Sequence, residues 1–564
     1  MAASSLPPQT GASLPLRVLL TTEATYPFHW GGVSTWCHAL IRELPEVEFS
    51  LLAMSAGLYE RARFEFHKNL VEFRAVPLWG LRNAWELDTQ LPRAREVYRR
   101  RQRTTEASLQ EGFLPSYRIL LAQLLGEERD DEALARALHS IYRFVGTHDF
   151  DRSFRSRVVW ETFCEEVHAR FPQLVEQIGY RDTKISLVEL TSAYQWLYHW
   201  LFPLARTLPE TDVVHATMTG LCALIAVVCK FEYGSGFLLS EHGVYLRECY
   251  FAYHRNTGSL FGKFLKISFA RRMTQLAYSY ADVVAPCCDY NHRWEKRLGV
   301  DARRIRTAYF GVDADLHSPQ ERRSAESPVV AWAGRIDPLK DVETLLRAAA
   351  VVHEALPEVR FLLYGSTPPG NERYQERCLK LHAELGLEGV VSFEGYSDNV
   401  VEAFAGSDLA VLSSISEAFP LSTLEAMLCG KPVVATDVGG IAEQVTPDCG
   451  RVVRPRDPEA LGRAIIEVLS DSELRLNLAR AARERATSLF GVERFRATHR
   501  SIYDLVLEAR EPLALPASSD PAPLDGRSSA RRQRPENRAW SAEKRRRWPR
   551  TATEPAGAIE TAYR

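Results

Sequence analysis

The sequence has no surplus of charge of either sign. Its 564 residues include 70 lysines and arginines against 72 aspartates and glutamates, a formal net charge of −2. A protein that holds nucleic acid or anionic lipid by bulk electrostatics needs a concentrated excess of cations. The balance therefore argues against a nucleic-acid partner. Lysine itself is rare, and we interpret the arginine excess first as genomic codon bias and only second as phosphate chemistry.

Cysteine and long apolar runs are also scarce. The ten cysteines, including the adjacent Cys287 and Cys288, contain no C-x2-C pair and show no recurring spacing, so neither a disulfide framework nor a zinc site is indicated. The longest apolar stretch, 220–228, is about half of the roughly 20 residues that a membrane span needs and predicts a buried helix. The apolar run after Arg17 is too short for a signal-peptide core. We therefore expect a cytoplasmic protein.

Short β-branched runs alternate with helical patterns at both ends of the chain. This alternation is typical of parallel sheets covered by helices on both faces, an α/β fold. The first set of expected strands is 17–23, 48–54, 73–78, 212–216, 237–243, 283–286 and 305–311, and the second is 328–335, 359–365, 391–395, 409–413, 432–436 and 450–453. Two Rossmann-like domains are therefore expected.

Domain boundaries follow from these strands. We expect a disordered N-terminus over 1–15, an N-terminal domain over 16–315 and a C-terminal domain over 328–489. More than 120 residues separate the third expected strand from the fourth, too many for one βα crossover. A helical insertion at about 80–205 accounts for them. A terminal helix over 490–510 is expected to pack back toward the N-terminal domain.

From Glu511 onward the composition changes to proline, serine, alanine and arginine. The interval 527–550 contains ten basic residues, a composition typical of disorder. We interpret 511–564 as a solvated basic tail. The alternative is a docking or membrane-surface segment, with Trp540 and Trp548 as its large anchors.

A glycine-rich turn follows the first expected strand. Trp30-Gly31-Gly32 leads into an apolar-periodic helical segment. Glycines at such a turn let the backbone approach a ligand, and the helix start offers free N–H groups and a partial positive charge. This favours an anion or sugar site. The alternative is a tight strand-to-helix turn in which Ser34 is the N-cap.

Two cations open the second domain. Arg335 follows an expected strand end, and Lys340 precedes an expected helix at 342–350. Cations at the carboxyl edge of a parallel sheet suit a diphosphate, because arginine forks onto two oxygens and lysine acts as a point charge. Surface salt bridges with Asp337 and Asp341 are the alternative.

Two carboxylates, Glu417 and Glu425, are separated by seven residues. We expect the first in a loop at a strand end and the second in the first turn of the next helix, with the N–H groups of Ala418, Phe419 and Leu421 directed into the same cleft. One carboxylate can accept hydrogen bonds from sugar hydroxyls and the other from the cis-diol of a ribose. A capping box of Ser422 with Glu425 is a competing role for Glu425.

These motifs together resemble family 4 retaining glycosyltransferases of the GT-B fold. The matching pieces are the Gly-Gly turn, G-R-x-x-x-x-K, E-A-F-P-L-x-x-L-E-A-M and G-K-P-V-V-A-T-x-V-G-G. More narrowly, the segments 20–36, 212–220 and 240–248 and the helical insertion are similar to the PelF-like branch, whose members build a Pel-type exopolysaccharide in the cytoplasm. The resemblance implies two Rossmann-like domains that face a central cleft.

The resemblance also implies a role for each motif residue. Arg335 and Lys340 would hold the donor diphosphate, with the Gly31-Gly32 turn closing over it from the other domain. Glu417 would bind hydroxyls of the donor sugar, and Glu425 would bind the ribose. The backbone amides that would meet the sugar and phosphate are those of Ala418, Phe419 and Leu421.

One departure from the family pattern concerns histidine. Many relatives carry H-x-H after a strand, with the second histidine near the anomeric carbon, whereas this chain has His215-Ala216-Thr217. Either Thr217 leaves that contact to backbone and substrate, or another group such as His242 replaces it. His215 and His242 are both candidate catalytic residues, with a structural role as the alternative. Arg247 and Glu248 are expected to face the acceptor.

The reaction implied is transfer of a hexosyl unit from a nucleotide-diphosphate sugar, with UDP as the expected carrier, to a growing exopolysaccharide. No nucleophilic carboxylate is indicated, so we favour a same-face displacement in which the leaving diphosphate takes the acceptor proton. No metal or other cofactor is expected, because Arg335 and Lys340 supply the positive charge. The Asp313-Ala314-Asp315 sequence is interpreted as a loop.

The expected partners are the UDP-sugar donor, a glycan acceptor and membrane-embedded synthase and export proteins, which would recruit the chain to the inner face of the membrane. Two alternatives stay open. One is a GT-B epimerase or phosphorylase that acts on a nucleotide sugar or phosphorylated sugar. The other is a non-catalytic sugar-nucleotide-binding subunit of a polysaccharide synthase complex.

Overall fold

The computed structural model describes residues 14–510 except 59, 82, 88–93, 178, 180–183, 256–257, 316–326 and 398–399. The expectations for the basic tail over 511–564, and for all but the last two residues of the N-terminus over 1–15, lie outside the described residues. No helix in the part of the chain described is both long and apolar enough to cross a membrane.

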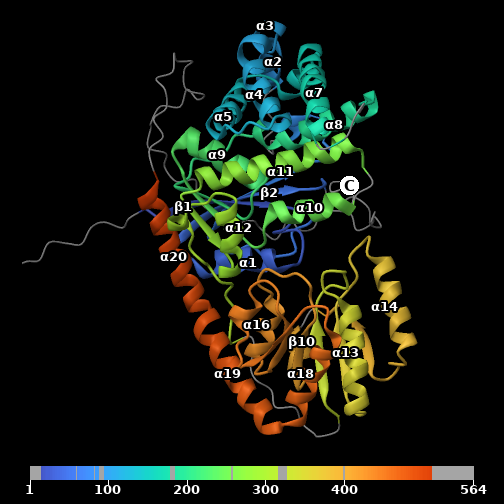
Figure 1. Cartoon of the computed structure of the whole chain (residues 1–564). Coiled ribbons are helices and arrows are strands. Elements are labelled where there is room, and N and C mark those ends of the chain that lie inside the picture. Colours follow the sequence, from blue (N-terminus) through green and yellow to red (C-terminus); the bar gives the residue numbers. More distant parts are fainter. Residues whose placement is uncertain are drawn as a thin grey trace, which may run out of the picture.

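Two six-stranded sheets, in which every paired strand is parallel, form the framework (Figure 1). The first has the order β3-β2-β1-β4-β5-β6, and the second has the order β12-β11-β10-β7-β8-β9. The strands of the first sheet are β1 (Leu16–Glu23), β2 (Val47–Ser55), β3 (Leu70–Pro77), β4 (Val213–Ala216), β5 (Gly236–Glu241) and β6 (Val283–Pro286). Those of the second are β7 (Val329–Ala333), β8 (Arg360–Tyr364), β9 (Val391–Gly395), β10 (Leu409–Leu412), β11 (Val433–Thr436) and β12 (Gly450–Val453). The α/β prediction is confirmed.

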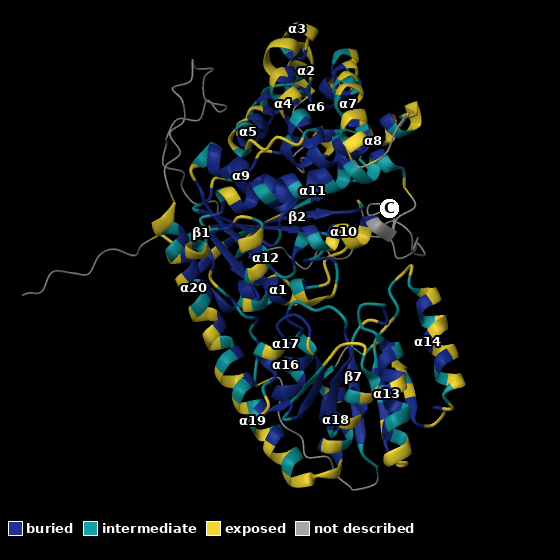
Figure 2. Cartoon of the chain, in the orientation of Figure 1, coloured by how far each residue is buried: buried dark blue, intermediate teal, exposed yellow. Residues whose placement is uncertain are grey.

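The central strands are buried along their whole length. Every residue of β4, β5, β7, β10 and β11 is buried, as Figure 2 shows in dark blue. Parallel strands that helices cover on both faces have no solvent-exposed side, so their sequences are continuous apolar runs. The same burial explains why short β-branched runs in the sequence located these strands.

One expected strand, 305–311, is wrong. Ile305 forms only an isolated bridge with Val284, and the amides of Arg306 and Ala308 donate to the carbonyls of Val284 and Pro286. The chain then leaves the sheet edge, and Phe310 is buried, with its ring 6.0 Å from that of Phe419 in the second domain and 5.3 Å from that of His242. The apolar pattern of this segment therefore reflects packing between the domains rather than a seventh strand.

Helices fill the long interval between β3 and β4. They are a 3-10 turn (Ala84–Leu87), α2 (Ala94–Arg103), α3 (Glu106–Ser108), a π-helical turn (Leu109–Phe113), α4 (Leu114–Leu125), α5 (Asp131–Thr147), α6 (Phe150–Phe154), α7 (Arg157–Gln177), α8 (Leu187–Leu201) and a second 3-10 turn (Phe202–Ala205). This layer packs on α9 (Leu221–Tyr233) and α11 (Leu260–Tyr280), at the top of Figure 1. The buried helix predicted at 220–228 is confirmed by α9, in which every residue from Leu221 to Phe231 is buried.

The remaining helices surround the two sheets. They are α1 (Gly32–Glu43), α10 (Tyr245–Arg255), α12 (His292–Arg297), α13 (Val342–Ala355), α14 (Glu372–Glu384), α15 (Val400–Ala405), α16 (Leu421–Leu428), α17 (Ile441–Gln444), α18 (Pro458–Ser470), α19 (Ser472–Phe490) and α20 (Val492–Ala509). α19 packs on α16 in the second domain, whereas α20 returns to the first domain and packs on α1, β4, β5 and β6. In Figure 1 the two helices run along one side of both domains.

A buried hydrogen bond attaches α20 to the first sheet. The hydroxyl of Tyr503 lies 2.8 Å from Nδ1 of His215, and the hydroxyl of Ser240 lies 2.8 Å from Nε2 of the same ring. Both rings are fully buried. Burial holds the pKa of His215 well below its usual value, so the ring is neutral and each nitrogen has one partner.

Removing this bond tests how α20 is held. We expect Tyr503→Phe to lower the free energy of unfolding by about 1–3 kcal/mol, because it leaves a buried ring nitrogen without a partner. Urea unfolding followed by circular dichroism measures the change. Tyr98→Phe is the matched control, since Tyr98 is 63% exposed; equal stability of the two variants would contradict the anchoring role.

Candidate functional site

The loop between β10 and α16 is held from several sides. The hydroxyl of Ser413 donates to the carbonyl of Lys340 (2.8 Å), and the amide of Ile415 donates to the carbonyl of Leu339 (2.8 Å). The carbonyl of Ser414 accepts a hydrogen bond from the Thr436 hydroxyl at the end of β11 (2.6 Å). These contacts fix the loop at the carboxyl edge of the second sheet, where Glu417 follows.

An ion pair forms at this edge. Nζ of Lys340 lies 2.5 Å from Oε1 of Glu417, and the hydroxyl of Ser414 donates to the same oxygen at 2.6 Å. Arg335 lies 3.2 Å from Asp337, but its side chain is 67% exposed. The expected alternative, a salt bridge of Arg335 with Asp337, is thus present, whereas Asp341 is the N-cap of α13. The exposed guanidinium still offers N–H donors to a ligand.

Free amides lie beside this ion pair. The N-cap of α16 is Pro420, and no side chain caps the helix. Among the described residues, no hydrogen bond uses the amide groups of Ala418, Phe419 or Leu421. A helix start with unpaired N–H groups attracts anions. The amides that the sequence singled out are therefore available.

The predicted capping box at Glu425 is wrong. α16 begins at Leu421, so Glu425 lies in the second turn rather than the first, and the N-cap position is a proline that has no N–H for it to accept. Within the described residues the Glu425 carboxyl accepts no hydrogen bond, and burial raises its pKa to about 7. It is a partly buried acid for which the described part of the chain supplies no hydrogen-bond donor.

The Gly31-Gly32 turn meets α16 from the first domain. A Cβ on Gly32 would lie 3.8 Å from Cδ1 of Leu421, so the start of α1 faces the start of α16 across the two domains. Gly31 is the N-cap of α1. The alternative with Ser34 as N-cap is wrong, because Ser34 is buried inside the first turn and caps nothing.

The Phe419 side chain belongs to the junction between the domains. It is 3% exposed, and its ring lies 5.2 Å from that of Tyr309, 6.0 Å from that of Phe310 and 5.4 Å from that of Phe490. Only its backbone amide is left for a ligand. The prediction for Phe419 concerned the amide, and the structure adds an interdomain role for the ring.

Glu443 of α17 joins the domains, and no sequence motif singled it out. Its carboxylate accepts hydrogen bonds from the amides of Asp289 and Tyr290, each at 2.8 Å, and from the Tyr309 hydroxyl at 3.0 Å. All three donors belong to the first domain. Sequence reasoning missed Glu443 because its partners lie more than 130 positions away.

The two candidate histidines differ in their surroundings. His215 is fully buried with both nitrogens bonded, an arrangement that favours the structural alternative, and its catalytic role stays a prediction. Thr217 is also buried, and its hydroxyl donates to the Thr21 carbonyl at 2.9 Å. Neither nitrogen of His242 has a partner among the described residues, and burial lowers the pKa of His242 to about 3. His242 is thus a neutral imidazole, packed 4.3 Å from the Trp36 ring.

Two residues of α10 approach the second domain. Arg247 donates to the Ser416 hydroxyl at 2.8 Å, next to Glu417. The pKa of Glu248 is raised, mainly by burial. The positive charges of Arg247 and Arg335 lower this pKa, and the negative charge of Glu417 raises it. Arg247 therefore contacts the Glu417 loop rather than open space, and Glu248 shares the electrostatic environment of Arg335.

Buried carboxyls at the edge of the first sheet were not predicted. Glu23, the last residue of β1, is 3% exposed and accepts a hydrogen bond from the Leu221 amide at 3.1 Å. Burial raises its pKa to about 7. Burial also raises the pKa of the neighbouring acids Glu241 and Glu295. For Glu23 and Glu241 the signal available in the sequence was their position at strand ends, whereas Glu295 lies on α12 and carried no such signal.

The Asp313-Ala314-Asp315 sequence behaves as the loop that was expected. Asp313 lies 3.5 Å from Arg42 and accepts the Asp315 amide at 3.0 Å. Within the described ranges, no three His, Cys, Asp or Glu side chains lie together as metal ligands.

Glu443 provides a direct test of the junction. We expect Glu443→Gln to lower the free energy of unfolding by about 1–3 kcal/mol, because a neutral amide replaces a carboxylate that accepts three hydrogen bonds. Hydrogen exchange of the Asp289 and Tyr290 amides should accelerate. Glu459→Gln on the exposed face of α18 is the control; unchanged exchange in Glu443→Gln would show that the junction does not depend on this carboxylate.

Comparison with known proteins assigns both halves of the chain. Residues 16–303 match the family described as "Domain of unknown function (DUF3492)", and residues 313–485 match "Glycosyl transferases group 1". The D-inositol 3-phosphate glycosyltransferase of Saccharomonospora viridis is 35% identical over 223 residues, which are 36% of this chain and 50% of that protein. The enzyme of the same name from Mycobacterium leprae is 37% identical over 151 residues, 25% of this chain and 34% of that protein. The chain thus spans half or less of the curated relatives' length.

Solved structures confirm the GT-B prediction. HepE from Anabaena in complex with UDP has a TM-score of 0.54 and 16% identity, with 87% of this chain and 100% of that chain covered. Sucrose-phosphate synthase from Thermosynechococcus elongatus has a TM-score of 0.55 and 18% identity, with 88% and 100% covered. At these identities the likeness establishes the fold alone. In this chain a DUF3492 domain is followed by a group 1 glycosyl transferase domain, and the two together form a GT-B fold. The chain therefore belongs to the DUF3492 family.

Proposed function

We propose that this protein is a retaining glycosyltransferase that moves a hexosyl unit from a UDP-sugar to a growing glycan. The observation that carries the proposal is the convergence of Arg335, the Lys340–Glu417 ion pair and the unpaired amides at the start of α16, opposite the Gly31-Gly32 turn. The group 1 match and the curated relatives, which are named glycosyltransferases, support it. HepE, which shares the fold, was solved with UDP.

In this proposal the donor diphosphate lies between the two domains. Arg335 binds two of its oxygens as a fork, and Lys340 binds as a point charge while keeping its contact with Glu417, because an ammonium group has three donors. The amides of Ala418, Phe419 and Leu421 complete the cradle. Glu417 and Glu425 accept hydrogen bonds from the sugar and from the ribose diol respectively.

The chemical step follows from these positions. Cations and amides stabilise the charge that develops on the departing diphosphate, which is the usual role of preorganised donors. The acceptor hydroxyl attacks the anomeric carbon from the face that the diphosphate leaves, and its proton passes to a diphosphate oxygen. His242, which is neutral and lies at the end of β5, is proposed to orient the sugar. No metal ion is needed for charge neutralisation in this scheme.

The finer assignment rests on the resemblance of the first domain to the PelF-like branch. We propose that the glycan is a Pel-type exopolysaccharide made in the cytoplasm, and that membrane-embedded synthase and export proteins receive it. A GT-B epimerase and a non-catalytic sugar-nucleotide-binding subunit are the rival functions. Analysis of the reaction products distinguishes the glycosyltransferase from an epimerase. Sugar-nucleotide binding without turnover would indicate the non-catalytic subunit.

Calorimetric titration with UDP, GDP and ADP tests the donor site. We expect selective UDP binding that weakens at least roughly tenfold in Arg335→Ala and in Glu425→Ala, because each change removes charge-assisted or paired hydrogen bonds. Arg463→Ala is the control for the loss of an arginine. Arg463 lies on the exposed side of α18, where it forms a long ion pair of 3.8 Å with Glu459. UDP binding that survives in both site variants would refute the assigned site.

The raised pKa of Glu425 adds a pH dependence. The ionised carboxylate accepts both ribose hydroxyls, and with a pKa of about 7 it is mostly protonated at pH 6 and mostly ionised at pH 8. Affinity for UDP-glucose should therefore rise by roughly fivefold to tenfold from pH 6 to pH 8. Glu425→Gln should abolish this rise, whereas Glu248→Gln, which removes the other raised carboxyl of the site, should retain it. A rise that persists in Glu425→Gln would assign the titration elsewhere.

A further inference from the structure

The helical insertion contains a cavity that the proposed reaction does not use. Its volume is about 520 Å³, within the range of about 300–1,000 Å³ that is typical of small-molecule sites. The lining combines aromatic rings, among them Tyr194 and Tyr198, with polar side chains and one charged side chain, which are Asn83, Gln195, His199 and Arg155. Apolar faces with a few polar groups are typical of a ligand site.

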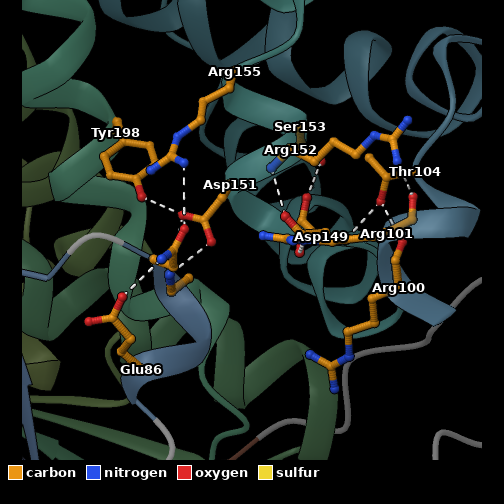
Figure 3. A network of polar contacts seen from close by, with 12 residues as sticks. Glu86, Arg100, Arg101, Thr104, Asp149, Asp151, Arg152, Ser153, Arg155 and Tyr198 are labelled. Atoms are coloured by element: carbon orange, nitrogen blue, oxygen red, sulfur yellow. Dashed lines mark hydrogen bonds and ion pairs between the residues drawn. The ribbon is translucent and has the colours of Figure 1, made fainter. Parts of the chain in front are cut away.

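Hydrogen bonds on the protein side hold the tyrosine rings in place. The Tyr198 hydroxyl donates to Oδ1 of Asp151 at 2.6 Å, and the Tyr194 hydroxyl donates to the Phe154 carbonyl at 2.5 Å. Asp151 is 2% exposed and also accepts the Ala84 amide at 3.0 Å. Figure 3 shows Tyr198 directed toward Asp151. With their hydroxyls engaged, both rings offer mainly their carbon surfaces to the cavity.

His199 adds a neutral ring to this lining. The side chain is 7% exposed, and burial lowers the pKa of His199 to about 4. Its Nδ1 has no hydrogen-bond partner in the part of the chain described, but this atom is itself buried. The ring therefore contributes its carbon surface to the cavity rather than a hydrogen bond.

One lining residue lies a short way along the chain from the sheet edge at which the proposed reaction takes place. Asn83 follows the carboxyl end of β3, and all strands of this sheet are parallel, so the carboxyl end of β1 lies at the same edge. β3 is separated from β1 by β2 alone, which corresponds to about 10 Å across the sheet. The carboxyl end of β1 leads to the Gly31-Gly32 turn.

We propose that this cavity is a second saccharide site, which holds a sugar unit of the acceptor glycan away from its reacting end. The glycan's identity rests on the proposed function, but the chemistry of the cavity does not. Fixed aromatic faces suit the C–H face of a sugar ring, and the amide of Gln195 suits its hydroxyls. The Asn83 amide already donates to Glu86 at 2.9 Å, so it would share its remaining hydrogen-bonding capacity with the sugar. A phosphate is disfavoured, because Arg155 already contacts Asn83 at 3.5 Å and lies beside the Asp151 carboxylate.

Saturation-transfer NMR of the full chain tests the inference, with chitohexaose and maltohexaose as probes and saturating UDP present. We expect at least one hexaose to bind, and its dissociation constant to rise roughly tenfold in the double variant Asn83→Ala/Gln195→Ala, which removes two amide partners. Thr191→Ala is the control, because Thr191 is exposed on the same helix and does not line the cavity. Arg335→Ala should leave hexaose binding unchanged.

The outcomes separate the two proposals. Absence of hexaose binding at up to about 10 mM, or equal binding by the wild type and the double variant, would overturn the saccharide site. Loss of UDP binding in the double variant would also overturn it, because the cavity would then hold the nucleotide. Hexaose binding that depends on the cavity in a protein that binds no UDP would support the saccharide site and reject the proposed function alone.

Discussion

The loop that carries Glu417 is also a wall of the junction between the domains, and the rest of the site depends on this double use. The amides of Ala418, Phe419 and Leu421 have no partner among the described residues, while the Phe419 ring packs against aromatic rings of the first domain and of α19. The glycines of the V-G-G motif make this possible. A Cβ on Gly439 would lie 2.2 Å from the Glu417 carbonyl oxygen, and one on Gly440 would lie 2.7 Å from the Phe419 ring. Larger residues at these positions would displace the loop and the junction together.

Charge at the proposed site is paired in one place and unpaired, among the described residues, in another. The Lys340–Glu417 pair is largely buried, with side chains 17% and 11% exposed, whereas the carboxyl of Glu425 is left without a partner and is pushed toward its neutral form by burial. A partly buried acid without a hydrogen-bond partner lowers the stability of the fold. A residue with a purely structural role would not be expected to carry this penalty. Hydroxyl groups that donate to Glu425 would recover this energy. The arrangement thus favours a polyhydroxylated ligand over a bare anion, which Arg335 alone would suit.

Local pattern located most of the framework but not the contacts between distant segments. Buried parallel strands appear as short β-branched runs, and Arg335, Lys340 and Glu417 lie next to strand ends, so the sequence predicted both. The sequence pattern wrongly predicted a strand at 305–311, because Phe310 packs against Phe419 of the other domain rather than within the first sheet. It left His215 ambiguous because its partner Tyr503 is 288 positions away. Glu443 was missed for the same reason, since nothing near it in the sequence indicates that it accepts amides of the first domain.

The connection between the domains constrains how they can move. The chain passes between them near Val312 and again near Gly491, and these two crossings form a bridge in which the Val312 amide donates to the Phe490 carbonyl at 2.9 Å. Because the crossings are bonded to each other, the two connections are held together at one place. Phe419 and Phe490 pack on each other nearby, with ring centroids 5.4 Å apart. Arg247 donates to Ser416 at 2.8 Å across the domains, so the position of the Glu417 loop is tied to how the two domains meet.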